Sequence, residues 1–100
     1  METGVSHPRT RLDDLIHHPV RFSLMAALAK AEELEFRFLR DALDVSDSVL
    51  SRQAWALEEV GYVAIRKGLV GRRPRTWLSL TPQGRKTFEE HVRALREIAG

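Results

Sequence analysis

The segment that decides the fold is residues 46–75, SDSVLSRQAWALEEVGYVAIRKGLVGRRPR. Its first half repeats apolar residues at helical spacing, and its second half alternates apolar with polar residues as a strand does. Ser46 is a favourable N-cap residue, and Gly61 is of a residue type that commonly ends a helix. These signals predict a helix over residues 46–60 and a strand over residues 62–67.

The predicted helix has two faces when its residues are placed at about 100° per position. The face expected to pack on the core comprises Leu50, Gln53, Ala54, Leu57 and Val60. The face expected to point outward comprises Ser48, Ser51, Arg52, Trp55 and Glu59. Serine and arginine at the start of a helix suit a DNA major groove, where they bond base edges or phosphates. A merely solvated face is the alternative, although an outward Trp is unusual on such a face.

Upstream of this helix, the sequence predicts two further helices and a minimal strand. Residues 19–32 begin with a Pro, which suits a first helical position, and then repeat apolar residues at helical spacing. Residues 34–36 are expected to form the short strand and residues 37–43 the second helix. A tight turn over residues 44–45 then leads into the helix that starts at Ser46.

Downstream, the sequence predicts a β-hairpin and a last helix. Residues 68–74 are expected to form a turn-rich loop that joins strands over residues 62–67 and 76–80. Thr81 as N-cap and Pro82 as first residue start the last helix. The apolar stripe of this helix comprises Phe88, Val92, Leu95 and Ile98 or Ala99.

In chain order, these elements predict a mainly α fold with a small β-hairpin: helix, short strand, helix, helix, hairpin, helix. Two helices joined by a tight turn and followed by a hairpin with a basic loop form a winged helix-turn-helix, in which the hairpin is the wing. We expect residues 1–11 to be a flexible arm, residues 12–80 the DNA-binding domain and residues 81–100 a C-terminal dimerisation helix.

Composition excludes several classes of protein. The 100 residues include no Cys, so a disulfide framework and a thiolate zinc site are impossible. No apolar run approaches the roughly 20 residues needed to cross a bilayer, and no secretory signal is recognisable, so we expect a soluble, cytoplasmic protein without a membrane partner. Neither a catalytic motif nor ligand-like spacing occurs, which predicts no enzyme activity, no metal and no other cofactor. Helix-capping or surface roles are expected for the four histidines, His7, His17, His18 and His91.

Charge is unevenly distributed along the chain. Between Val60 and Phe88 there is no acidic residue, whereas the basic residues there are Arg66, Lys67, Arg72, Arg73, Arg75, Arg85 and Lys86. Three arginines in one stiff loop without acidic neighbours are suited to phosphates and to the minor groove, whose negative potential is strongest in narrow tracts. The predicted DNA-binding residues are Ser48, Ser51, Arg52, Trp55, Arg72, Arg73 and Arg75. For Trp55, packing on the wing is slightly favoured over contact with the DNA backbone or an interface.

Several short motifs follow one another in a specific order and spacing. They are HPVR (18–21), Phe36 with Leu39, VSD (45–47), LSR (50–52), LEEVGYV (57–63), GRRPRT (71–76) and LTPQGR (80–85). This pattern resembles the compact winged-helix transcriptional regulators related to the MarR and ArsR groups, over residues 12 to about 98. The resemblance implies homodimers, joined by their terminal helices, that bind roughly palindromic sites. The Cys or His clusters of metal-sensing ArsR proteins have no counterpart in this sequence.

Apolar residues near both ends of the chain favour a homodimer. The stripe on the last helix is longer than a small core can cover, and the patch at residues 12–16 is not expected to be needed by the three-helix core. The predicted dimerisation residues are Leu12, Leu15, Ile16, Phe88, Val92 and Leu95; a last helix folded back over a monomer is the alternative. The sequence thus predicts a DNA-binding regulator, by preference a repressor, with no small-molecule effector indicated. The competing hypothesis is a winged-helix module that binds proteins and not DNA.

Overall fold

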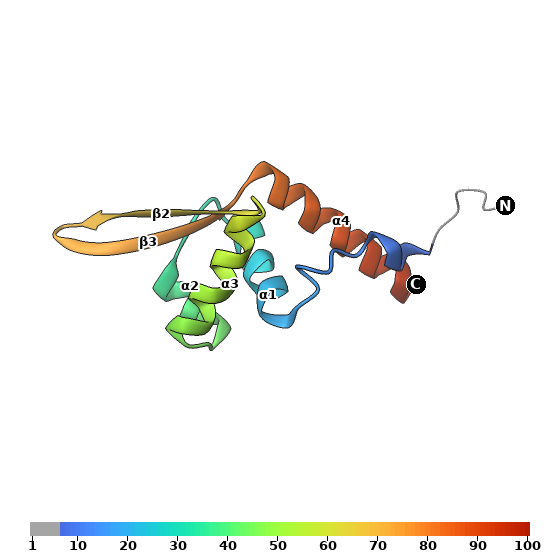
Figure 1. Ribbon diagram of the computed structural model, residues 1–100, viewed down its shortest axis with the longest axis horizontal. Coiled ribbons are helices and arrows are strands. Elements are labelled where there is room, and N and C mark those ends of the chain that lie inside the picture. The colour runs from blue at the N-terminus through green and yellow to red at the C-terminus, as the bar shows by residue number, and fades with distance from the viewer. Residues whose placement is uncertain (1–6) are drawn as a thin grey trace.

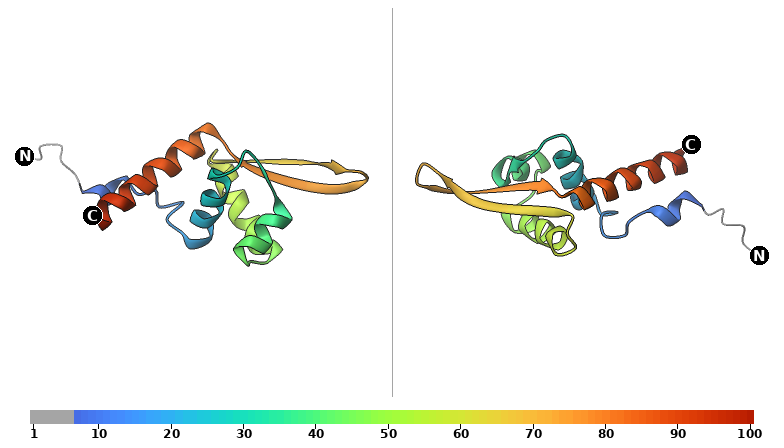
Figure 2. Two further views of the ribbon diagram at one scale, coloured as in Figure 1. Left: turned by 180° about the vertical axis from the view of Figure 1, so that it is seen from behind. Right: turned by 90° about the horizontal axis from the view of Figure 1, so that it is seen from above.

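The computed structural model describes residues 7–100, so the first six residues of the predicted arm lie outside the described residues. Three helices form a body, from which a hairpin and a long helix extend in opposite directions (Figures 1 and 2). The elements are the 3-10 helix η1 (Pro8–Arg11), α1 (Pro19–Ala29), β1 (Leu34–Glu35), α2 (Phe36–Leu43), α3 (Asp47–Glu59), β2 (Val63–Val70), β3 (Arg73–Leu80) and α4 (Pro82–Ala99). This order is the predicted winged helix-turn-helix. The part of the chain that the structure describes contains no helix both long and apolar enough to span a membrane.

Local signals set the starts of the helices. The side chain of Ser46 accepts a hydrogen bond from the N–H of Val49 at 3.1 Å, and Thr81 accepts one from Gly84 at 2.9 Å. His18 caps α1 through Nδ1, which accepts from the N–H of Val20 at 3.2 Å. These bonds satisfy N–H groups that have no partner inside a helix. The capping role expected for histidines is therefore confirmed at His18, and it is confirmed at His7, which caps η1. The expected capping or surface role is wrong for His91, which is fully buried in α4 and accepts a hydrogen bond from the N–H of Asp13.

The sheet has three antiparallel strands in the order β1-β3-β2. β1 lies beside β3 and pairs Leu34 with Leu78 and Glu35 with Trp77. Because residues 30–33 must turn the chain into this strand, α1 ends at Ala29 and not near residue 32 as predicted. α2 begins at Phe36, directly after β1, so no linker separates the sheet from the helix-turn-helix.

One apolar core joins α1, α2, α3 and the base of the sheet. Its fully or almost fully buried side chains are Ile16, Leu24, Met25, Leu28, Leu39, Leu50, Ala54, Leu57, Val63 and Leu78. The core therefore includes Ile16, and Leu15 and Phe88 pack against it, so the expectation that the core does not need residues 12–16 is wrong for Leu15 and Ile16.

Asp13 explains why this segment folds back onto the core. Its carboxylate accepts hydrogen bonds from the N–H groups of Leu15 at 2.8 Å and Ile16 at 3.3 Å. The same carboxylate accepts a bond from the hydroxyl of Tyr62 at 2.7 Å, which raises the pKa of that phenol. Asp13 thus closes a turn and ties it to Tyr62, between α3 and β2.

Val60 is a second correction to the predicted core. It was expected to face inward with Leu57, but 43% of its surface is exposed. α3 ends at Glu59, and Val60 is the C-cap residue at which the chain leaves the helix. Helical periodicity no longer determines the direction of a side chain at that position.

Candidate nucleic-acid interface

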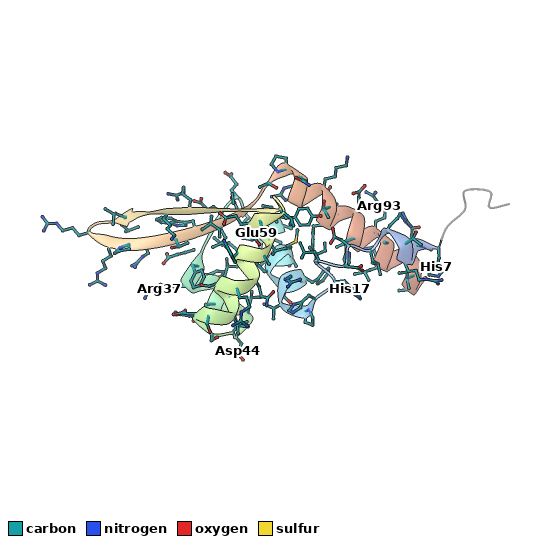
Figure 3. The ribbon with its side chains drawn as sticks, viewed as in Figure 1. His7, His17, Arg37, Asp44, Glu59 and Arg93 are labelled. Carbon is teal, nitrogen blue, oxygen red and sulfur yellow. The ribbon has the colours of Figure 1, made fainter. Side chains whose placement is uncertain are left out.

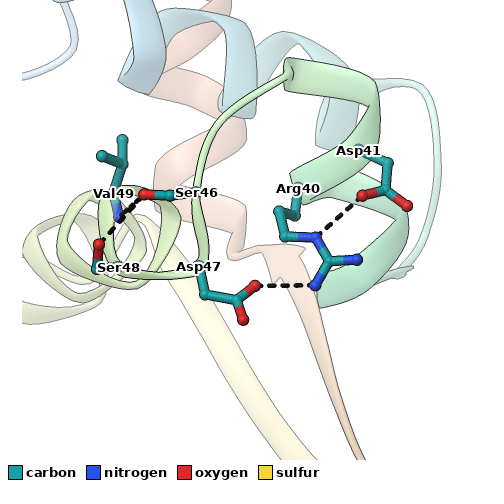
Figure 4. A network of polar contacts seen from close by, with 6 residues as sticks. All are labelled: Arg40, Asp41, Ser46, Asp47, Ser48 and Val49. Atoms are coloured by element: carbon teal, nitrogen blue, oxygen red, sulfur yellow. Dashed lines mark hydrogen bonds and ion pairs between the residues drawn. The ribbon is translucent and has the colours of Figure 1, made fainter.

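The joint between α2 and α3 is fixed by polar contacts (Figure 4). Arg40 on α2 donates from Nη1 to the carboxylate of Asp47 at 2.9 Å, and from Nε to Asp41 at 2.9 Å. Asp47 lies in the first turn of α3, where a negative charge is favourable. Asp44 makes the turn between the helices with a positive φ of 55°, a conformation that Asp adopts more readily than most residues. The start of α3 is therefore held against α2.

The two faces of α3 agree with the prediction except at Val60. Leu50, Gln53, Ala54 and Leu57 are buried. The amide oxygen of Gln53 accepts a hydrogen bond from Nε of Arg21 on α1 at 2.6 Å. Ser48, Ser51, Arg52, Trp55 and Glu59 are all exposed. The Trp55 side chain is 60% exposed, so the packing role favoured for it accounts for only part of its surface.

The strands of the wing (residues 63–80) are longer than predicted. β2 runs to Val70 and β3 restarts at Arg73, so the loop predicted over residues 68–74 shrinks to the two-residue turn Gly71-Arg72. Gly71 has a φ of 65°, which glycine adopts at little cost in the first central position of a hairpin turn. Glycine and proline suggested a loop, but Pro74 lies within β3 opposite Leu69.

A groove of about 810 Å³ separates α3 from the wing. The residues that line it are Phe36, Asp47, Ser51, Arg52, Ala54, Trp55, Ile65, Lys67, Thr76 and Leu78. Ile65 pairs with Leu78 and Lys67 with Thr76, so alternate residues of β2 and their partners on β3 form the wing side of the groove. Lys67 and Thr76 are absent from the predicted site. The two-residue alternation of a strand, which puts Lys67 on the same face as Ile65, was a signal that could have identified Lys67.

At the base of the wing (residues 63–68 and 75–80, below the tip at residues 69–74), arginines are paired with acids. Arg66 donates two hydrogen bonds to Glu33, at 2.9 and 2.7 Å, and its guanidinium lies 4.0 Å from the ring centroid of Trp77. The bond from Arg66 lowers the pKa of the Glu33 carboxyl. Arg75 pairs with Glu35 at 3.2 Å. The prediction that Arg75 lacks an acidic neighbour is therefore wrong, because β1 pairs with β3 and brings two distant acids to the wing.

At the tip of the wing, side chains that end in nitrogen atoms project away from the ribbon (Figure 3). Arg72 and Arg73 are exposed, and within residues 7–100 neither has an ion-pair partner. The predicted site residues therefore divide into three groups. Ser51, Arg52 and Trp55 line the groove, Arg72 and Arg73 lie beyond it at the tip, and Arg75 belongs to the paired base. Ser48 lies outside the groove lining, with its hydroxyl 3.2 Å from that of Ser46.

A helix-turn-helix with a hairpin beside its second helix also occurs in other proteins, to which this chain is similar in sequence and in structure. Residues 20–99 match the family model described as a winged helix DNA-binding domain. The chain belongs to this family. An uncharacterised protein of Methanocaldococcus jannaschii is 29% identical to this winged helix protein over 80 residues, which are 80% of this chain and 87% of the relative.

Solved structures share the fold of this winged helix protein. A transcriptional regulator homologue from Pyrococcus horikoshii superposes with a TM-score of 0.85 at 22% identity, covering 95% of both chains. YusO from Bacillus subtilis gives a TM-score of 0.79 at 24% identity, covering 93% of this chain and 65% of YusO. A MarR-family regulator from Silicibacter pomeroyi gives 0.67 at 24% identity, covering 90% and 60%. The predicted resemblance is confirmed: the family is that of winged helix DNA-binding domains, and the fold is the one found in these regulators.

Proposed function

We propose that this protein is a transcriptional regulator, by preference a repressor, that binds roughly palindromic duplex DNA as a homodimer. α3 lies in the major groove, and the wing contacts the backbone or the minor groove. The observation that carries the proposal is the separation of charge along the wing. Glu33 and Glu35 pair with the arginines at the base, whereas Arg72 and Arg73 at the tip stay available.

The exposed face of α3 suits a major groove. That groove is about 12 Å wide and admits a helix. Ser48 and Ser51 are small, and Arg52 is long enough to form two hydrogen bonds to a guanine or to reach a phosphate. Arg52 also shares the groove lining with Lys67 of the wing, so two cations from separate elements face the same hollow.

The test of DNA binding is its dependence on salt. We expect the wild-type protein to bind mixed duplex DNA with a steep negative slope of log affinity against log salt. In Arg72→Ala/Arg73→Ala the slope should fall by about 0.9 for each phosphate that the wing no longer neutralises. The matched control is Arg93→Ala/Arg96→Ala, which removes the same charge from α4, where Arg93 lies far from the wing (Figure 3).

Equal slopes for the two double variants would remove the wing from the mechanism. A wild-type protein that binds no duplex at low salt would contradict the proposed function and favour the protein-binding module instead.

The proposed dimer rests on the terminal segments. Leu12, Val92 and Leu95 remain half-buried and do not belong to the apolar core. Leu95 also borders a hollow of about 230 Å³ at the start of α1, which an apolar side chain of a second copy could enter. A two-fold dimer is the commonest closed assembly. It would present two α3 helices roughly 34–36 Å apart, one turn of DNA.

Light scattering at micromolar concentration tests this assembly. We expect twice the 11.4 kDa chain mass for the wild type and one chain mass for Leu95→Asp. Leu69→Asp places the same charge at the wing and should remain a dimer. A monomeric wild type, or a dimeric Leu95→Asp, would contradict the interface.

A further inference from the structure

The tip of the wing exposes apolar side chains on both faces of the ribbon. Leu69 is 68% exposed and Val70 is 53% exposed. Because neighbouring residues of a strand point to opposite faces, Leu69 lies on one face with its partner Pro74, and Val70 lies on the other with Arg73. Each face of the ribbon thus carries an exposed aliphatic side chain next to a turn whose own side chain is Arg72.

Leu69 and Val70 contribute nothing to the packing of the core. Ile65 and Leu78, lower on the ribbon, pack with the body, but neither Leu69 nor Val70 belongs to the core or packs against it. Hydrophobic burial therefore cannot explain their presence on a projecting hairpin. The arginines beside them indicate an anionic partner, which must also have apolar surfaces.

The minor groove of DNA has this combination of surfaces. Its walls are the carbon atoms of the deoxyriboses, its floor carries hydrogen-bond acceptors of the bases, and phosphates line its rims. A ribbon that enters tip first turns one face toward each wall. Leu69 and Pro74 would meet one wall, and Val70 the other. Arg72 would then point to the floor and Arg73 to a phosphate.

We propose that the wing tip enters the minor groove as an apolar ribbon that packs on both sugar walls and widens the groove. This inference rests on the proposed DNA binding. A ribbon with side chains on both faces is about 10 Å thick, as the spacing of packed sheets shows. An undisturbed minor groove is only about 6 Å wide, so the duplex has to open and bend away from the wing.

A wing tip that widens the minor groove should prefer a different DNA sequence from a tip that binds through arginine alone. Arginine alone favours A-tracts, whose minor groove is narrow and strongly negative, but A-tracts are also stiff. Steps of TA are easily deformed, so a ribbon that widens the groove favours them. Two duplexes of equal length and identical composition, one of alternating TA and one an unbroken A-tract, separate the two cases.

The test compares the wild type with Leu69→Thr/Val70→Thr on both duplexes. Threonine has the β-branched shape that suits a strand, and both substitutions leave every charge in place. We expect the wild type to prefer the alternating duplex. The variant should bind that duplex about tenfold more weakly, since less apolar surface is buried, and should no longer show the preference. Its salt slope should stay unchanged, because every phosphate contact remains.

Val60→Thr is the matched control, since Val60 is similarly exposed but lies at the end of α3. A wild type that prefers the A-tract, or a variant that binds both duplexes as the wild type does, would overturn the inference while leaving DNA binding intact. If the variant instead loses binding to anionic lipid vesicles, or changes the mass of the assembly, the tip serves a membrane or a protein and the inference is wrong. A wild type that binds neither duplex would overturn the proposed function as well.

Discussion

The wing end of the molecule (residues 47–80) and its terminal end (residues 7–18 and 82–100) treat polar groups in opposite ways. At the terminal end, Asp13 accepts three hydrogen bonds, and its own N–H donates to Nδ1 of His91 at 3.0 Å. Arg11 pairs with Glu97 in the same region. At the wing end, Arg72 and Arg73 remain in solvent. The terminal end therefore uses these polar groups in internal bonds, whereas the tip of the wing leaves Arg72 and Arg73 without an ion-pair partner among residues 7–100.

This contrast predicts that variants at one end change stability and variants at the other change DNA binding. The largest effect is expected for Gly84→Ala at the start of α4. A Cβ atom there would lie 2.0 Å from the backbone oxygen of Tyr62, which cannot move aside as a flexible side chain can. We expect a loss of about 3 kcal/mol in the free energy of unfolding, the upper range for over-packing.

Urea unfolding of Gly84→Ala and of the exposed neighbour variant Gln83→Ala measures this loss. Gln83→Ala should unfold at nearly the wild-type concentration. Equal midpoints for the two variants would show that the packing of α4 on Tyr62 tolerates displacement, and the contrast between the ends would lose its main support.

Arg52→Ala should give the largest effect on binding with none on stability. Arg52 is exposed on α3 and, within residues 7–100, forms no ion pair. Removal of its bond to a base should weaken binding to a selected operator by about 1–3 kcal/mol, with less effect on random duplex. Titrations measure the affinity for the operator and for random duplex, and a urea curve measures the free energy of unfolding. An unfolded Arg52→Ala, or normal operator affinity, would place the residue elsewhere in the mechanism.

His91 makes the stability of the terminal end depend on pH. Burial and the neighbouring His17 imidazole lower its pKa, against the opposing effect of Asp13. The unfolded chain then binds a proton near the ordinary value of 6.5, before the folded chain does. Stability from the neutral imidazole is complete above that value and is lost as the pH falls below it.

The matched variant is His91→Gln, whose side-chain oxygen can still accept the bond from Asp13. We expect the free energy of unfolding of the wild type to fall from pH 7.5 to pH 5.5 more steeply than that of His91→Gln. Identical slopes for the two proteins would mean that His91 does not carry the pH dependence.

The smallest effect is expected for Glu35→Gln, which breaks the ion pair with Arg75. Partly exposed pairs of this kind contribute up to about 1 kcal/mol, so stability should hardly change. The freed Arg75 should make the salt slope of DNA binding slightly steeper. Glu32→Gln removes the same charge from a neighbouring exposed position and serves as control. A large loss of stability in Glu35→Gln, but not in Glu32→Gln, would show that Glu35 stabilises the fold by more than its ion pair with Arg75 accounts for.

Local signals predicted most of the fold. Ser46 and Thr81 start their helices as N-caps because the bonds involved span only three residues. The exposed face of α3 followed from periodicity in the same way. The wing was more difficult, because glycine and proline mark loops in isolation but are tolerated within a paired hairpin.

Long-range contacts account for what the sequence could not predict. Asp13 is not among the predicted site residues, and its partners Tyr62 and His91 are 49 and 78 residues away in the sequence. Glu33 reaches Arg66 only because β1 lies beside β3. Neither periodicity nor capping rules contain information about such pairs, so the division of the wing into a neutralised base and a charged tip required the three-dimensional arrangement.

The direct junction of β1 with α2 has a mechanical consequence. Glu35 is hydrogen-bonded into the sheet that carries the wing, and the next residue, Phe36, already belongs to the helix that holds α3 through Arg40 and Asp47. The direct junction therefore holds α3 at a fixed distance from the base of the wing. We expect such a protein to measure how far one groove of the duplex lies from the next. Overwinding or underwinding of the DNA would then change affinity even where every base is unchanged.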